Sequence, residues 1–290
     1  MRSAARSPTG TARSADLSGT ADRCRALSRP PAAAIVGLCP GGGKMVSLAG
    51  QKVVIIGGSY GMGLATAELA IDAGAEVAIA ARTPEKLAEA SRNLAERGGR
   101  PVPWRALRVE DRPAVASFLA ECAPIDHLVL PGSTVKPILY EDLTDENARE
   151  AFESKFWGPF WAAYDARPHL RHGGSILFFT GVAAKRPVKG YMLGACINGA
   201  LNAATRSLAL EFAKLGCRVN AIAPGLCDTP LNDILHAHDK EERYRQMAAR
   251  LPVGRIGHAE DCALGALYLM ANGYVTAQVL GIDGGQEVMD

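Results

Sequence analysis

The 290-residue sequence contains no run of about 18 uninterrupted apolar residues, which is the length that a helix needs to cross a lipid bilayer. It also contains no C-x-x-C pair, and its seven cysteines are odd in number and scattered in spacing. A disulfide framework or a zinc site would have paired or clustered cysteines. These absences argue against a membrane protein and against a bound metal. They predict buried free thiols and a reducing compartment, the cytoplasm.

The sequence has no large excess of charge of either sign, because its formal net charge is only +2. Residues 1–44 hold seven basic and two acidic side chains, whereas residues 45–290 hold 25 basic and 28 acidic ones. The larger part is therefore mildly acidic and shows no electrostatic footprint for nucleic acid. With 48% hydrophobic and 21% charged residues, the composition also excludes wholesale disorder, a coiled coil and a collagen-like chain.

Residues 1–44 lack apolar periodicity, and their first part is rich in Ser, Ala, Arg and Pro. We interpret this segment as a disordered N-terminal extension, or as an artefact of start choice in a protein that begins at Met45. Its arginine- and serine-rich, acid-poor character also resembles a transit peptide, so a targeting role stays open. In each case the sequence predicts that residues 45–290 form a single domain.

From residue 45 onward, short β-branched runs alternate with stretches of helical periodicity. Strands are predicted at residues 52–57, 76–80, 102–107, 127–130, 175–180, 217–223 and 279–282. Helices are predicted at residues 63–73, 84–97, 112–123, 145–166, 193–215 and 259–271. This alternation predicts an α/β fold, a Rossmann-like doubly wound parallel sheet of seven strands with helices on both faces.

A glycine-rich turn joins the first predicted strand to the first predicted helix. Glycines permit positive φ and a close approach of the backbone to a ligand, and the helix N-terminus offers free N–H groups to a pyrophosphate. In this strand–turn–helix setting the turn predicts dinucleotide binding, with a plain tight turn as the alternative. The residues expected to bind the cofactor are Gly57, Ser59, Tyr60, Gly61, Met62 and Gly63.

The end of the second predicted strand indicates which dinucleotide binds. A carboxylate there would accept a hydrogen bond from the adenosine ribose and favour NAD. At the end of this strand the sequence has two alanines followed by Arg82 instead, and no acidic residue stands there. Because a guanidinium can hold a 2′-phosphate with two hydrogen bonds, Arg82 predicts NADP(H) as the cofactor. A solvated arginine at a strand end is the alternative.

These motifs resemble those of the short-chain dehydrogenase/reductase family, and the resemblance spans about residues 48–286. The turn at residues 57–63 is similar to the family's cofactor turn. The segment with Pro224, Gly225 and Thr229 is similar to the family's Pro-Gly segment, which lies against the nicotinamide. The resemblance implies an NADP(H)-dependent oxidoreductase for a small-molecule carbonyl or alcohol, and a homodimer or homotetramer.

The catalytic set departs from the family's pattern. The family's Ser, Tyr and Lys match Gly181, Gly194 and Asn198, and none of the seven tyrosines has a lysine four residues later. The family's Asn matches Lys155, so the family's Asn and Lys have exchanged places in this alignment. We hypothesise that the Lys155 ammonium reaches the same region from the neighbouring helix. A surface lysine at 155 and an Asn198 that only caps or packs its helix are the alternatives.

The proton donor is harder to assign from the sequence. Tyr191 lies three residues before Gly194, and a phenol next to an ammonium is expected to have a lowered pKa and to act as a general acid. An aromatic residue that lines the pocket is the alternative for Tyr191. Thr180 is a candidate hydrogen-bond donor to a carbonyl, and Lys185 and Lys189 are further candidate proton donors.

Two functions follow from these observations. The first is an NADP(H)-dependent reductase or dehydrogenase with an atypical catalytic set. The second is an NADP(H)-binding protein without redox turnover, such as a sensor, a partner or a non-redox enzyme. Residues 228–251 are expected to form a lid over the substrate. Its candidate lining residues are Leu231, Ile234, Leu235 and His236.

Overall fold

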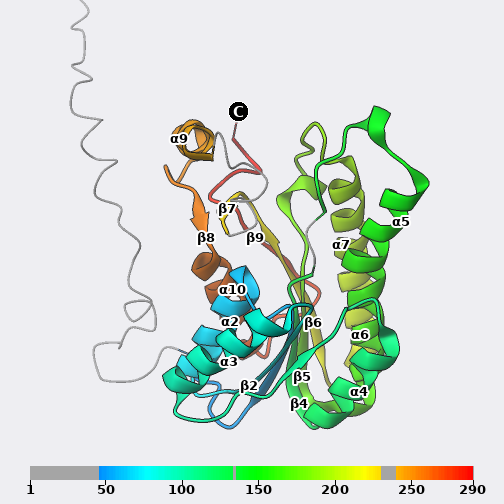
Figure 1. Ribbon diagram of the computed structural model, residues 1–290, viewed down its shortest axis with the longest axis vertical. Coiled ribbons are helices and arrows are strands. Elements are labelled where there is room, and N and C mark those ends of the chain that lie inside the picture. Colours follow the sequence, from blue (N-terminus) through cyan, green and yellow to red (C-terminus); the bar gives the residue numbers. More distant parts are fainter. Residues whose placement is uncertain (1–45, 133–134, 230–239, 290) are drawn as a thin grey trace, which may run out of the picture.

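The computed structural model describes residues 46–132, 135–229 and 240–289 (Figure 1). Seven parallel strands form one sheet in the order β3-β2-β1-β4-β5-β6-β9, which confirms the predicted fold. The strands are β1 (Lys52–Ile56), β2 (Glu76–Ala81), β3 (Trp104–Ala106), β4 (Ile125–Leu130), β5 (Leu170–Phe179), β6 (Arg218–Pro224) and β9 (Val279–Ile282).

Strand β1 shows why these runs form strands at the centre of the sheet. It is built almost entirely of β-branched residues, and its side chains alternate between the two faces. Val53 and Ile55 belong to one hydrophobic core, and Val54 and Ile56 belong to the other. Both faces of the strand are therefore buried, as expected for a parallel sheet between two helical layers.

Helices cover both faces of the sheet (Figure 1). One layer contains α2 (Gly61–Asp72), α3 (Pro84–Gly98) and α10 (Ala259–Ala271), and the other contains α4 (Arg112–Cys122), α6 (Gly158–Ala166) and α7 (Met192–Ala213). The remaining elements are α5 (Asp145–Phe152), α9 (Lys240–Arg250) and a two-stranded sheet of β7 (Cys227–Asp228) and β8 (Gly257–His258).

The long helix predicted over residues 145–166 is interrupted in the structure. A π-helical segment, Glu153–Trp157, separates α5 from α6. Helix α9 forms the last part of the segment predicted as a lid, but the four proposed lining residues of that lid lie outside the described residues. Residues 1–44 lie outside them as well.

Four cysteines match the prediction of buried free thiols: Cys122, Cys217, Cys227 and Cys262. Cys196 is free and exposed on α7. Within the described ranges, no cluster of three or more potential metal-ligating side chains occurs. Nor does any helix in the described part of the chain have the length and apolar character needed to cross a membrane.

His127 is a buried polar side chain at the centre of the sheet. It is 3% exposed on β4, with Nδ1 lying 2.8 Å from Ser175 Oγ and Nε2 lying 2.6 Å from Gln51 Oε1. Burial, helped by the nearby charge of Arg218, lowers the pKa of His127 to about 4, although Asp126 opposes the shift. The imidazole therefore stays neutral in the folded protein at neutral pH.

Acidification is expected to destabilise the fold through His127. Between pH 6.5 and 4 the unfolded chain binds a proton that the folded chain does not, so the free energy of unfolding falls by about 3 kcal/mol as pH decreases through this window. Urea unfolding at several pH values measures the slope. The slope should become shallower in His127→Gln and stay unchanged in His172→Gln, which alters an exposed histidine. Equal slopes in all three proteins would refute this assignment.

Candidate functional site

The sheet reverses its strand order between β1 and β4, and the candidate site lies at this point. Gly57 follows β1 and Pro131 follows β4. A Cβ at Gly57 would lie 3.5 Å from Pro131 Cδ, so the two loops are in close proximity. In open parallel sheets, ligands bind in the crevice at the carboxyl ends of the strands where the order reverses.

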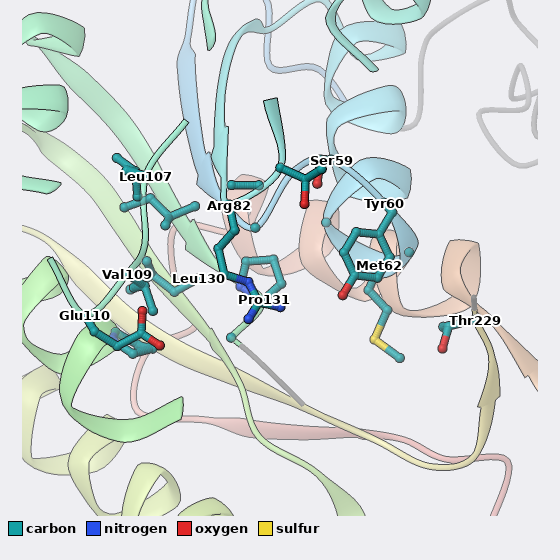
Figure 2. A pocket seen from close by; sticks show the side chains of 18 residues that line it. Ser59, Tyr60, Met62, Arg82, Leu107, Val109, Glu110, Leu130, Pro131 and Thr229 are labelled. Carbon is teal, nitrogen blue, oxygen red and sulfur yellow. The ribbon is translucent and has the colours of Figure 1, made fainter. Parts of the chain in front are cut away.

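A cavity occupies this crevice, and Figure 2 shows the side chains around it. Eight of the ten residues predicted to bind the cofactor line it: Gly57, Ser59, Tyr60, Gly61, Met62, Gly63, Arg82 and Thr229. The structure thus brings together residues from three separate segments of the chain. Pro224 and Gly225 are not among the lining residues.

The turn between β1 and α2 depends on glycine for steric reasons. A Cβ at Gly63 would lie 2.0 Å from the carbonyl oxygen of Gly57, so no other residue fits this position. Gly61, the first residue of α2, has a φ of +58°. No side chain caps the N-terminus of α2, and its first turn contains no acidic residue. The first N–H groups of this helix are therefore suited to bind an anion.

Arg82 is the cation of the cavity. It follows β2, is exposed, and makes no hydrogen bond or ion pair with any other residue that the structure describes. A second cation lies nearby, because the Lys86 ammonium is 5.2 Å from the centroid of the Tyr60 ring. The guanidinium of Arg82 is therefore available to a phosphate.

Pro224 and Gly225 lie at the carboxyl end of β6. The Gly225 N–H donates a hydrogen bond to the Ile282 carbonyl at 3.0 Å, and a Cβ at this glycine would lie 2.7 Å from Asp283 Cα. The glycine is therefore required where two segments cross closely. The role of both residues at the nicotinamide stays a prediction.

Lys155 lies within the π-helical segment that interrupts the long helix. Such segments are frequent at functional sites, because one extra residue in the turn re-aims the side chains. A Cβ at Gly132, which lines the cavity, would lie 3.9 Å from Lys155 Cγ and 3.9 Å from the Phe179 carbonyl oxygen. Burial lowers the pKa of the Lys155 ammonium to about 8. The Lys155 side chain thus lies near Gly132, just beyond the carboxyl end of β4.

The Asn198 side chain lies directly beside Gly181. Asn198 is 5% exposed, and a Cβ at Gly181 would lie 2.7 Å from its Nδ2. The Asn198 side chain therefore fills the space that a serine at 181 would need. Its Oδ1 is buried and has no hydrogen-bond partner among the described residues. Two of the departures from the family's pattern thus belong together sterically.

The Tyr191 ring lies against Gly194. A Cβ at Gly194 would lie 3.1 Å from Tyr191 Cδ1, so the glycine leaves room for the ring. Burial raises the pKa of Tyr191, although the charge of Arg243 partly opposes this shift. The expectation of a lowered phenol pKa is therefore wrong, because burial outweighs the effect of the Arg243 charge. The phenol stays protonated at neutral pH and can donate a hydrogen bond.

Two other candidate donors are engaged elsewhere. The Thr180 hydroxyl donates to the Ile222 carbonyl at 3.3 Å, and the Thr180 N–H donates to the same oxygen at 2.7 Å. Both donors of Thr180 are thus bonded to the backbone of β6, and the structure does not support Thr180 as the substrate's hydrogen-bond donor. Lys185 is exposed and lies 2.9 Å from a carboxylate oxygen of Glu287, so its ammonium forms a surface ion pair.

Several residues that line the cavity were absent from the sequence-based candidates. Leu107, Val109 and Glu110 follow β3, and Pro131 follows β4. The strand order could have identified these residues, since the carboxyl ends of all parallel strands lie at one edge of the sheet. Neither residue type nor spacing distinguishes these side chains from ordinary loop residues.

A parallel, doubly wound sheet with a glycine-rich turn at its reversal point is the architecture typical of α/β nucleotide-binding proteins. A family model described as enoyl-(acyl carrier protein) reductase matches residues 57–287. The chain belongs to the short-chain dehydrogenase/reductase family of oxidoreductases.

Two relatives are similar to this chain over most of their length. The chain is 31% identical over 255 residues to the short-chain dehydrogenase/reductase ATR9 of Stachybotrys chlorohalonatus, covering 83% of this chain and 98% of that protein. It is also 31% identical over 246 residues to glucose 1-dehydrogenase of Gluconobacter oxydans, covering 82% and 92% of the two chains.

Two solved structures are also similar. A small-chain dehydrogenase in complex with NADPH is 30% identical, with a TM-score of 0.70 over 82% of this chain and 99% of that one. A short-chain oxidoreductase from Pseudomonas aeruginosa PAO1, described as containing an atypical catalytic center, is 28% identical. Its TM-score is 0.77 over 83% of this chain and 98% of that one.

Proposed function

We propose that the protein is an NADP(H)-dependent oxidoreductase that interconverts a carbonyl and an alcohol with an atypical catalytic set. The observation that carries the cofactor choice is Arg82, whose guanidinium lines the cavity directly after β2 and has no partner among the described residues. No carboxylate stands at this strand end to receive a ribose hydroxyl. The similar dehydrogenase that was crystallised with NADPH supports the same choice.

Binding and orientation of the cofactor are assigned to the residues of the cavity. The uncapped N-terminus of α2 would hold the pyrophosphate, and Arg82 would hold the 2′-phosphate. Pro224 and Gly225 would contact the nicotinamide at the end of β6. When bound, the cofactor supplies or accepts the hydride.

Lys155 is the proposed proton donor of the reduction. Its pKa of about 8 leaves the ammonium protonated at neutral pH and close to the value at which a general acid is most effective. Tyr191, with its raised pKa, is assigned a hydrogen bond to the carbonyl oxygen. Asn198 is proposed to orient the reacting groups, because its buried Oδ1 lacks a partner among the described residues.

Cofactor titration followed by a hydride-transfer assay tests this function. We expect the fluorescence of NADPH to report saturable binding, with NADH binding at least tenfold more weakly. We then expect NADPH that is stereospecifically deuterated at C4 to deliver the label to one face of a carbonyl substrate. Binding without transfer to any of a broad set of carbonyls would favour the alternative, an NADP(H)-binding protein without redox turnover. Absence of binding would overturn the cofactor assignment.

A further inference from the structure

A second cavity, the amino-end cavity, lies at the opposite edge of the sheet from the candidate cofactor site. Its lining includes the first residue of each of three strands, namely Lys52 of β1, Glu76 of β2 and Trp104 of β3. The last residues of β1 and β2, Ile56 and Ala81, line the cofactor cavity instead. Strands of five and six residues, rising about 3.3 Å per residue, place the two cavities roughly 15 Å apart.

The amino-end cavity is large enough for a small molecule, and its walls are mostly apolar. Its volume of about 520 Å³ falls in the range of about 300–1,000 Å³ that is typical of ligand sites. Two aromatic rings line it: Trp104, which is 42% exposed on the edge strand β3, and Phe118 of α4. The other apolar lining residues are Val77, Ala78, Pro101, Pro103 and Cys122. A flat ring bound here would cover indole surface that now faces water.

Four of the five charged side chains in this lining are paired with each other. Arg105 donates to both carboxylate oxygens of Glu121, at 2.6 and 2.8 Å. The Arg100 guanidinium lies 4.0 Å from the Glu76 carboxylate and also donates to two backbone carbonyls of the loop before β2. The fifth charge is that of Lys52, whose ammonium makes no hydrogen bond or ion pair with any other described residue.

The neighbours of Lys52 leave its charge uncompensated. Burial raises the pKa of the Cys122 thiol to about 11, although the charge of Lys52 opposes this shift. The thiol therefore stays neutral near pH 7 and supplies no negative charge. Asp126 lies outside the lining, where it accepts a hydrogen bond from the Lys52 backbone N–H at 2.7 Å and faces the Arg171 guanidinium at 3.8 Å. The amino-end cavity thus offers one free positive charge beside an aromatic wall.

We propose that the amino-end cavity binds a small aromatic carboxylate, with its ring against Trp104 and Phe118 and its carboxylate paired with Lys52. A carboxylate carries the single negative charge that matches one free ammonium, whereas a phosphate monoester carries about two at neutral pH. None of the residues assigned to cofactor binding or to catalysis lines this cavity. The site is therefore independent of the proposed function.

Titration of the full chain with 2-naphthoate, followed by ¹H–¹⁵N NMR, tests this site. The sequence has three tryptophans, and the indole signal that is lost in Trp104→Phe identifies Trp104. We expect this signal to shift saturably, with a dissociation constant below about 1 mM, and the signals of Trp157 and Trp161 to stay in place. Uncharged 2-naphthamide should bind at least about tenfold more weakly, because it lacks the charge that pairs with Lys52.

Lys52→Met separates the role of the charge from that of the apolar wall. This variant should bind 2-naphthoate at least about tenfold more weakly than the wild-type protein and should change the affinity for 2-naphthamide by less than about threefold. Lys214→Met is the matched control, because it removes an exposed lysine outside the amino-end cavity, and it should keep both wild-type affinities.

The possible results also separate this site from the proposed function. The site is overturned if the Trp104 signal does not shift, or if wild-type and Lys52→Met proteins bind 2-naphthoate equally. Saturating NADPH should leave the affinity for 2-naphthoate unchanged, and displacement by NADPH would overturn the site by showing that the naphthoate occupies the cofactor cavity. A protein that binds 2-naphthoate at Trp104 but does not bind NADPH supports this site and overturns the proposed function alone.

Discussion

Replacing Arg82 with alanine is expected to weaken NADPH binding by about 100-fold and to change NADH binding by less than threefold. The guanidinium is unpaired within the described residues and lines the cavity, so its removal costs charge-assisted hydrogen bonds to the 2′-phosphate and little else. Such bonds contribute about 1.5–3 kcal/mol, which corresponds to roughly 10–150-fold in affinity. Fluorescence titration with each cofactor measures the two dissociation constants.

Arg92→Ala is the matched control, because Arg92 is exposed on the neighbouring helix α3 and does not line the cavity. It should leave both affinities unchanged. Arg82→Asp should go further and favour NADH, since a carboxylate repels the 2′-phosphate and accepts from a ribose hydroxyl. Equal weakening of NADPH and NADH in Arg82→Ala would show that the arginine supports the fold or binds a group shared by both cofactors.

Replacing Lys155 with methionine is expected to lower kcat for carbonyl reduction by between about 100- and 10,000-fold, the range of a lost general acid. NADPH affinity should change by less than about fivefold. In the wild-type protein, kcat/KM for reduction should fall as pH rises through about 8, because the ammonium then loses the proton that it donates. Stopped-flow measurement of NADPH oxidation between pH 6 and 10 records this profile.

Lys155→Arg separates the effect of proton donation from the effect of the positive charge alone. A guanidinium keeps the positive charge but does not release its proton, so activity should stay low and the break near pH 8 should disappear. Recovery of the wild-type rate in this variant, or unchanged turnover in Lys155→Met, would contradict the role of donor. Lys214→Met is the control, because Lys214 forms an exposed ion pair with Glu211 and does not line the cavity. Tyr191→Phe should retain a measurable rate with a raised KM.

The fold was predictable because its signals are local. Strand β9 matches its predicted bounds, and β1 differs by one residue at its end, since β-branched runs next to glycine identify strands without any knowledge of their neighbours. The π-helical turn at Lys155 was not predictable, because no residue type marks the extra residue in the helix. The pKa of Tyr191 was wrongly predicted, because burial depends on the packing of distant segments.

By itself, the sequence determined the doubly wound sheet, the glycine-rich turn and the cation after β2, because each depends on residues adjacent in the chain. Only the tertiary structure decided that Asn198 fills the space beside Gly181 and that Lys155 reaches the end of β4. It also decided that Glu110, which follows β3, lines the same cavity as Arg82. These contacts join side chains from separate strands and helices. Their distances follow from the strand order and helix packing, which a linear pattern does not encode.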